Sequence, residues 1–160
     1  MKSTTIKESS FELWRLIGRV NHSIVLLRQR ELRQHHVPVR QLWVLVTIKD
    51  LGSMATLNEV AKRLDREPNV ISLQTACMEK DGLIKRTKNT PKSNLLKLEL
   101  TDKGLDIINT SQNSESIISI FSALSRDERQ QLDSLLDKIL VTAQKYRHKI
   151  NDPDNHFKEM

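Results

Sequence analysis

Five basic residues and no acidic one lie between positions 85 and 97, and this segment carries the clearest chemical signal in the chain. Uncompensated cations bind phosphate, because a nucleic-acid backbone presents a regular line of negative charge. Apolar runs on both sides can pair as strands, which would place the cations on a β-hairpin. Short basic runs also occur on ordinary solvated hairpins, so the preceding helices must decide between the two interpretations. The five residues are Lys85, Arg86, Lys88, Lys92 and Lys97.

The chain offers little for catalysis. It has no glycine-rich phosphate loop, no Gly-x-Ser-x-Gly elbow and no clustered thiolates, so we expect no enzymatic activity, no catalytic residue and no cofactor. Cys77 is the only cysteine, and we interpret it as a buried small hydrophobe rather than a redox sensor. His22, His35 and His36 make a weak metal set, because adjacent histidines point in different directions on a helix. A helix-end role is favoured for them, and no metal site is predicted.

Length and charge distribution indicate a polyanionic partner. The 160 residues fit one compact domain or a small domain with a helical extension, and the net charge is +6. Residues 1–36 carry seven basic and three acidic groups, residues 37–101 eleven and seven, and residues 102–160 eight and ten. No apolar run reaches the roughly 20 residues that span a bilayer, and the start lacks a signal-peptide pattern. We therefore expect a soluble cytoplasmic protein that binds nucleic acid through its first two thirds.

Few glycines and prolines favour a mainly helical architecture. Apolar spacing predicts a long amphipathic helix from Ser10 to about His35, and a second, largely buried helix after Pro38 that Gly52 ends in a left-handed conformation. Thr56 and Glu59 fit a capping box, which starts a third helix near Leu57.

A fourth helix should begin at Pro68 and end at Gly82, and two short helices joined by a tight turn match helix-turn-helix geometry. Residues 83–87 and 95–101 read as strands joined by the turn-rich NTPKSN. Thr101 can cap the next helix, and Ser125 with Glu128 offers a second capping box before a last helix.

This order of elements resembles the MarR family of bacterial and archaeal transcription regulators, over about residues 10–148. Three segments carry the resemblance: LNEVAKRL, MEKDGLIKR and LELTDKG. It implies a mainly helical winged helix-turn-helix fold with a small antiparallel β-wing, and a homodimer that represses from a pseudo-palindromic double-stranded operator. Many members are released by a small ligand or by oxidation. The implied organisation is an N-terminal dimerisation helix (10–36), a DNA-binding lobe (37–101), C-terminal dimerisation helices (102–148) and a tail (149–160).

The wing departs from the family pattern. The family's Asp-x-Arg pair is replaced here by Lys92 and Asn94. The usual arginine inserts into the minor groove, so Lys92 or Lys88 must substitute for it. Lysine is more strongly hydrated and lacks a planar fork, so we expect a weaker and less shape-selective contact.

The fourth helix is unusually uncharged, and its rotation stays open. Either Ile71, Thr75 and Met78 face the core, or Val70, Leu73 and Cys77 do. We favour the first, in which Asn69, Val70 and Leu73 face DNA and apolar contact with thymine methyls replaces some arginine readout. In the rolled alternative, Gln74 reads adenine. The DNA-binding residues expected from the sequence are Arg63, Arg66, Pro68, Asn69, Val70, Ser72, Leu73, Gln74, Lys85, Arg86, Lys88 and Lys92.

Two further hypotheses accompany this interpretation. His22, Arg40 and Trp43 would give a phenolic or carboxylate effector an aromatic wall and a cation, although a tryptophan on an apolar helix is more often part of the core. The alternative functions are a winged-helix module for protein assembly or RNA binding, or a regulator that responds to redox or metal. The cationic wing argues against a purely protein partner, and the 4% aromatic content argues against stacking on single-stranded bases.

Overall fold

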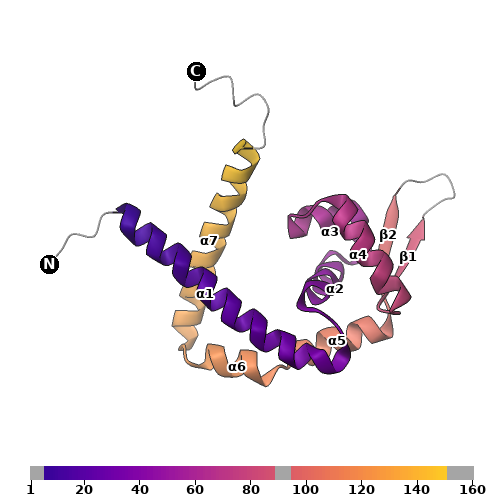
Figure 1. Ribbon diagram of the computed structural model, residues 1–160, viewed down its shortest axis with the longest axis horizontal. Coiled ribbons are helices and arrows are strands. Elements are labelled where there is room, and N and C mark those ends of the chain that lie inside the picture. Colours follow the sequence, from indigo (N-terminus) through magenta and orange to yellow (C-terminus); the bar gives the residue numbers. More distant parts are fainter. Residues whose placement is uncertain (1–5, 89–94, 151–160) are drawn as a thin grey trace, which may run out of the picture. The chain divides into compact units, whose positions relative to one another are not determined.

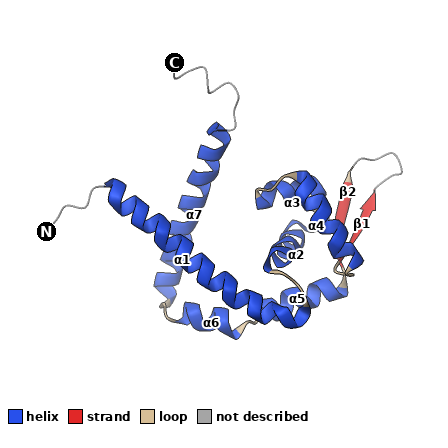
Figure 2. Ribbon diagram, viewed as in Figure 1, coloured by secondary structure: helices blue, strands red, loops and turns tan. Residues whose placement is uncertain are grey.

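The computed structural model describes residues 6–88 and 95–150. The chain forms two compact units, one up to Ser116 and one from Ile117 onward. Figure 1 follows the chain through its elements, and Figure 2 shows that the described part is helical apart from one two-stranded sheet. The mainly helical fold with a small antiparallel wing is therefore confirmed.

The first unit holds a long helix, a cluster of four shorter helices and the β-hairpin. Its elements are α1 (Ile6–Leu32), the 3-10 turn η1 (Arg33–His35), α2 (Val39–Leu51), the 3-10 turn η2 (Gly52–Met54), α3 (Leu57–Leu64), α4 (Pro68–Lys80), β1 (Ile84–Lys88), β2 (Leu96–Leu100) and α5 (Asp102–Gln112). Helix α6 (Glu115–Ser122) crosses the boundary between the units, and α7 (Arg126–Ile150) forms most of the second. The organisation expected from the sequence assigns α5 to the C-terminal helices (102–148). In the structure α5 packs against α2 and β2 and belongs to the first unit.

Side-chain caps set where three helices begin, as their sequences predict. The Thr56 hydroxyl accepts the Glu59 amide at 3.2 Å and starts α3, and the Thr101 hydroxyl accepts the Gly104 amide at 3.2 Å and starts α5. The box before α7 is complete, since Ser125 and Glu128 exchange hydrogen bonds of 2.8 and 3.3 Å. The box before α3 is only half formed, because the Thr56 amide donates to the Met54 carbonyl at 2.8 Å instead.

Glycines act at two junctions of the lobe. Gly82 has φ +71° and lets the chain turn from α4 into β1, and the Thr101 hydroxyl donates to its carbonyl at 2.7 Å. A Cβ on Gly104 would lie 2.3 Å from the Leu83 carbonyl oxygen, so only glycine lets α5 start this close to the strand. Gly52 ends α2 with φ 53° and ψ −122°. The prediction of a left-handed residue is wrong, because only φ has the left-handed value, whereas ψ directs the backbone into η2.

The hydrophobic core lies entirely within the lobe of α2 to α5 and the hairpin, joined by the end of α1. Helix α2 lies against α3, α5 and β2, and its buried residues confirm the prediction of a largely buried helix. Strand β2 is tied to the start of α3, since the Leu98 amide donates to the Ala55 carbonyl at 2.8 Å. The core residues are Leu32, Val37, Val39, Leu42, Val44, Leu45, Ile48, Ala55, Val60, Ala61, Ile71, Met78, Leu83, Ile84, Leu98, Ile107 and Ile108.

The two long helices carry apolar side chains that their own units leave exposed. On α1 these are Phe11, Leu13, Trp14, Leu16, Ile17, Val20 and Leu26. On α7 they are Leu135, Leu136, Ile139, Leu140 and Val141. No helix in the described part of the chain is both long and apolar enough to span a membrane.

Candidate nucleic-acid interface

Helices α3 and α4 form the expected helix-turn-helix. The turn is made by Asp65, whose left-handed backbone (φ 59°) ends α3, and by Arg66, whose amide returns to the Ala61 carbonyl at 2.9 Å. Glu67 then precedes α4, and Pro68 occupies its first turn, where a missing N–H costs nothing. The turn leaves Arg63, Arg66, Pro68 and Asn69 exposed at one end of the pair.

The structure decides the rotation of α4 in favour of the first alternative. Ile71, Thr75 and Met78 are buried in the core, while Leu73 is 73% exposed and Val70 49% exposed. The Thr75 hydroxyl is satisfied inside the helix by the Ile71 carbonyl at 2.7 Å, so a polar residue tolerates full burial. Asn69, Val70 and Leu73 therefore form the outer face, as predicted.

Gln74 does not lie on that outer face. Its side-chain Nε2 donates to the Arg40 carbonyl at 2.8 Å, which ties α4 to the first turn of α2. Adenine readout by Gln74 required the rolled helix, and that alternative is wrong for this structure. Ser72 is half-buried beside it, and its carbonyl accepts the Thr75 hydroxyl at 3.1 Å.

The wing is a regular hairpin with its cations unevenly exposed. Antiparallel pairing runs from Ile84 opposite Leu100 to Lys88 opposite Leu96, which sets Lys85 opposite Glu99. Lys85 and Lys88 are exposed, and Arg86 is half-buried with its amide donating to the Glu79 carboxylate at 2.9 Å. Lys92 and Asn94, with the whole tip 89–94, lie outside the described residues.

The described cations around α4 form no ion pair with a carboxylate of the described residues. Within the described part of the chain, ion pairs join Arg15 to Glu12 and Arg28 to Glu31, both on α1. No carboxylate there pairs with a cation of α3, of the turn after it or of β1, so those charges remain available to an external anion. The residues concerned are Arg63, Arg66, Lys85, Arg86 and Lys88.

The position of Cys77 departs from its interpretation in the sequence, whereas His35 and His36 lie at a helix end as expected. Cys77 is exposed on α4, so its reading as a buried small hydrophobe is wrong: the chosen rotation turns position 77 outward. His36 has a left-handed backbone (φ 55°) after η1, and the His35 ring nitrogen lies 3.2 Å from the Gln34 amide nitrogen. No group of three or more potential His, Cys, Asp or Glu ligands occurs within the described residues.

The three residues expected to line an effector pocket are all exposed. His22 lies on α1, and Arg40 and Trp43 lie on α2. Trp43 is 57% exposed, so the expectation that a tryptophan on this apolar helix belongs to the core is wrong. The other apolar residues of α2 are buried or half-buried, so Trp43 is the exposed apolar residue of this helix.

A polar cluster that the sequence did not reveal joins the end of α1 to the end of α5. Arg28 is buried, pairs with Glu31 and donates to the Ser111 carbonyl at 3.4 Å, while the Ser114 hydroxyl donates to Glu31 at 2.9 Å. Partial burial raises the pKa of Glu31, but hydrogen bonds from Ser116 and Ser114 and the charge of Arg28 outweigh it and hold the pKa below its ordinary value. A cavity of about 250 Å³ lies beside this cluster.

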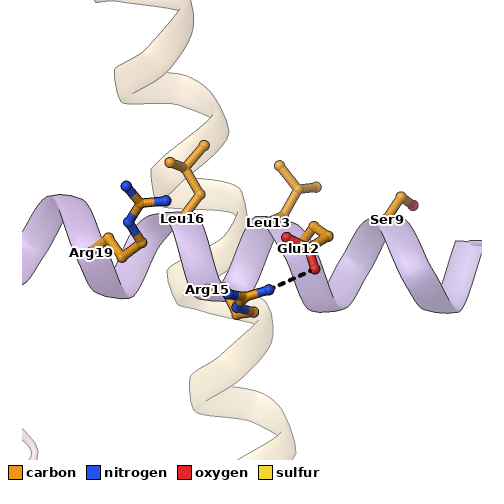
Figure 3. Close-up of a pocket in the computed structure, with 6 residues that line it drawn as sticks. All are labelled: Ser9, Glu12, Leu13, Arg15, Leu16 and Arg19. Carbon is orange, nitrogen blue, oxygen red and sulfur yellow. Dashed lines mark hydrogen bonds and ion pairs between the residues drawn. The ribbon is translucent and has the colours of Figure 1, made fainter.

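A second hollow is lined by residues of the N-terminal half of α1 (Figure 3). Leu13 and Leu16 point to one side of the helix there, and the Arg15 guanidinium donates to the Glu12 carboxylate at 3.0 Å. Exposed leucines flanked by charged neighbours are typical of a helix face that packs against a protein partner.

The comparisons with known proteins agree with this architecture. No family model matches the chain. The HTH-type transcriptional repressor MdtR of Bacillus subtilis (strain 168) is 34% identical over 73 residues, which is 46% of each protein, so the match spans about half of that relative.

Three solved structures share the fold. A ligand-bound organohalide-sensing regulator, RdhR-CbdbA1625 with 2,4-dichlorophenol, is 26% identical with a TM-score of 0.70 over 87% of this chain and 85% of its own. MepR of S. aureus in complex with DNA is 23% identical (TM-score 0.70; 81% and 96% covered), and a MarR protein from Peptoclostridium difficile is 16% identical (TM-score 0.77; 94% and 96% covered).

Proposed function

We propose that this chain is a MarR-family, sequence-specific double-stranded-DNA-binding repressor that acts as a homodimer and is released by a small ligand. One observation carries the DNA-binding part: an exposed α4 stands between two sets of cations, on α3 and on β1, that have no internal carboxylate partner. MdtR is described as a repressor, and MepR was solved bound to DNA, which supports the same role here.

The geometry suits base contacts from one element and phosphate contacts from its neighbours. Helix α4 fits the major groove with its N-terminal end toward the bases, while Arg63, Arg66 and Lys85 bind the flanking phosphates. Lys88 leads into the wing tip and, with Lys92, would enter the neighbouring minor groove in place of the family's arginine. Two-fold symmetry then sets the half-sites about 10 base pairs apart, centre to centre.

The exposed apolar faces of α1 and α7 supply the case for a homodimer. Burying apolar surface stabilises by about 25 cal/mol per Å², so a second copy that covers these faces removes a large cost of exposure. Each of α1 and α7 carries its apolar residues at helical spacing, which suits packing against another helix.

An effector would bind beside exposed aromatic surface on α2. RdhR-CbdbA1625 was solved with a chlorinated phenol, and Trp43 together with Arg40 and His22 offers an aromatic face with nearby donors for a phenol or carboxylate. Binding there would release DNA if the DNA-competent arrangement excluded the ligand.

The test is selection from a random-sequence duplex pool, followed by measurement of affinity against salt. We expect an enriched pseudo-palindrome, and an affinity that falls steeply with ionic strength. Replacing Lys88 and Lys92 by alanine should weaken binding to every duplex and lower the salt slope by about one unit per lysine for each copy that contacts phosphate. Lys138→Ala on α7 is the matched control. No enriched duplex, or an unchanged slope in the double variant, would contradict the DNA-binding role or the wing contact respectively.

A further inference from the structure

The outer face of α4 is apolar where a DNA-reading helix usually carries charge or amides. Between Pro68 and Met78 the helix holds no charged residue, and its exposed side presents Asn69, Val70, Leu73 and Cys77. Leu73 is the most exposed of the large apolar residues in the described structure. These side chains are not spare core residues, because the core contact of α4 is already made by Ile71, Thr75 and Met78.

Three contacts from separate elements lock this rotation. Gln74 binds the Arg40 carbonyl of α2, Glu79 accepts the Arg86 amide of β1, and Met78 is fully buried. Rolling α4 to hide Leu73 would break the first two contacts and remove Met78 from the core. The apolar outer face is thus a fixed property of the folded lobe.

The surroundings of this face indicate the chemistry of its partner. A water-exposed apolar patch flanked on two elements by unpaired cations fits a polyanion that also presents apolar groups at the depth of a helix. B-form DNA has one such group in its major groove, the C5 methyl of thymine. Double-stranded RNA lacks that methyl, and its narrow major groove excludes a helix.

We propose that Leu73 and Val70 read thymine C5 methyl groups, so that each half-site carries thymines beneath the middle of α4. Asn69, the only amide on this face, then reads an adjacent adenine through N6 and N7. The inference rests on the proposed DNA-binding function and deepens it: specificity here comes mainly from apolar contact, and phosphate contacts from Arg63 and Lys85 supply affinity without sequence information.

The test replaces thymines of the selected operator one at a time by deoxyuridine. This removes a single methyl and leaves base pairing and phosphates unchanged. Each methyl covered by α4 should contribute about four-fold in affinity, the value of one buried methyl-sized group, whereas thymines outside the α4 footprint should give no change. A flat scan with intact operator binding would overturn the inference and leave the proposed function standing.

Paired variants assign the contact to its residue. Leu73→Ala should weaken binding to the thymine operator. At one position per half-site, replacing thymine by deoxyuridine should then cause no further loss of affinity in this variant. Val70→Ala should do the same at a neighbouring position. Leu105→Ala on α5, also a partly exposed leucine, should keep the four-fold sensitivity. If Leu73→Ala and Val70→Ala lose equal affinity for both operators at every position, the methyl contact is excluded. Failure of the unmodified protein to bind any duplex would instead refute the proposed function.

Discussion

The lobe of α2 to α5 and the long helices α1 and α7 use their apolar residues in opposite ways. Every buried apolar residue of the described core lies between Leu32 and Ile108. By contrast, no apolar side chain described on α7 is buried, and neither is any on α1 before its last turns. The lobe completes a hydrophobic core within one chain, whereas the long helices need surface from elsewhere. Stability should therefore depend on lobe residues, and assembly on the helices.

The largest expected effect separates the two faces of α4. Met78→Ala should lower the free energy of unfolding by about 2–5 kcal/mol, because it opens a cavity in a fully buried site. Leu73→Ala, on the same helix but exposed, should change it by less than about 0.5 kcal/mol. Urea unfolding followed by circular dichroism measures both. Equal losses for the two variants would mean that α4 is rotated differently in solution.

A charge on α7 should break assembly and leave the lobe folded. Ile139→Asp places a carboxylate in the exposed apolar stripe of α7, and we expect a monomer by light scattering. Loss of the second half-site contact should reduce operator affinity by roughly 100-fold or more. The control Lys138→Asp changes the charge at the preceding position, and this variant protein should remain dimeric. A dimeric Ile139→Asp protein would exclude this stripe from the interface.

A smaller effect is expected at the N-terminal end of α4, where a substitution should reduce affinity for the operator but not for random DNA. Asn69→Ala should cost about 1–3 kcal/mol on the selected operator and little on random duplex, because only base readout is lost. Competition binding in matched salt compares the two. Equal losses on both duplexes would make Asn69 a contributor to packing or phosphate contact.

The smallest effect tests the cluster that links α1 to α5. The pKa of Glu31 is held below its ordinary value of 4.5, so its contribution to stability is present above that pH and is lost as the pH falls through the lowered pKa. Glu31→Gln should lower the free energy of unfolding by less than about 1 kcal/mol at about pH 7, and the difference from the parent protein should shrink toward about pH 3. Glu99→Gln, an exposed carboxylate of β2, is the control. A pH-independent difference would exclude the charged contact.

Local hydrogen bonds made much of this fold predictable. Thr56, Thr101 and Ser125 each accept an amide three residues ahead, so the start of a helix is encoded within one turn of sequence. The two strands of the wing could also be predicted from the sequence, because apolar runs on either side of a turn-rich segment can pair in only a few registers.

Side chains whose partners are distant in sequence were harder to predict. Gln74 contacts a carbonyl 34 residues away, and Arg28 contacts one 83 residues away, and neither spacing leaves a pattern in the sequence. Burial of Trp43 and Cys77 was predicted because tryptophan and cysteine are usually buried, but both side chains are exposed. Their exposure follows from the helix faces that packing selected.

The amino-acid sequence by itself determined the order and type of the elements, the caps of α3, α5 and α7, and a basic hairpin behind a nearly uncharged helix. Only the tertiary structure decided which side of α4 faces outward. That helix is apolar on more than one face, so its own periodicity allowed two rotations. Packing of Met78 into the core and the Gln74 contact with α2 selected the one that exposes Leu73, since buried volume and paired amides favour a single arrangement.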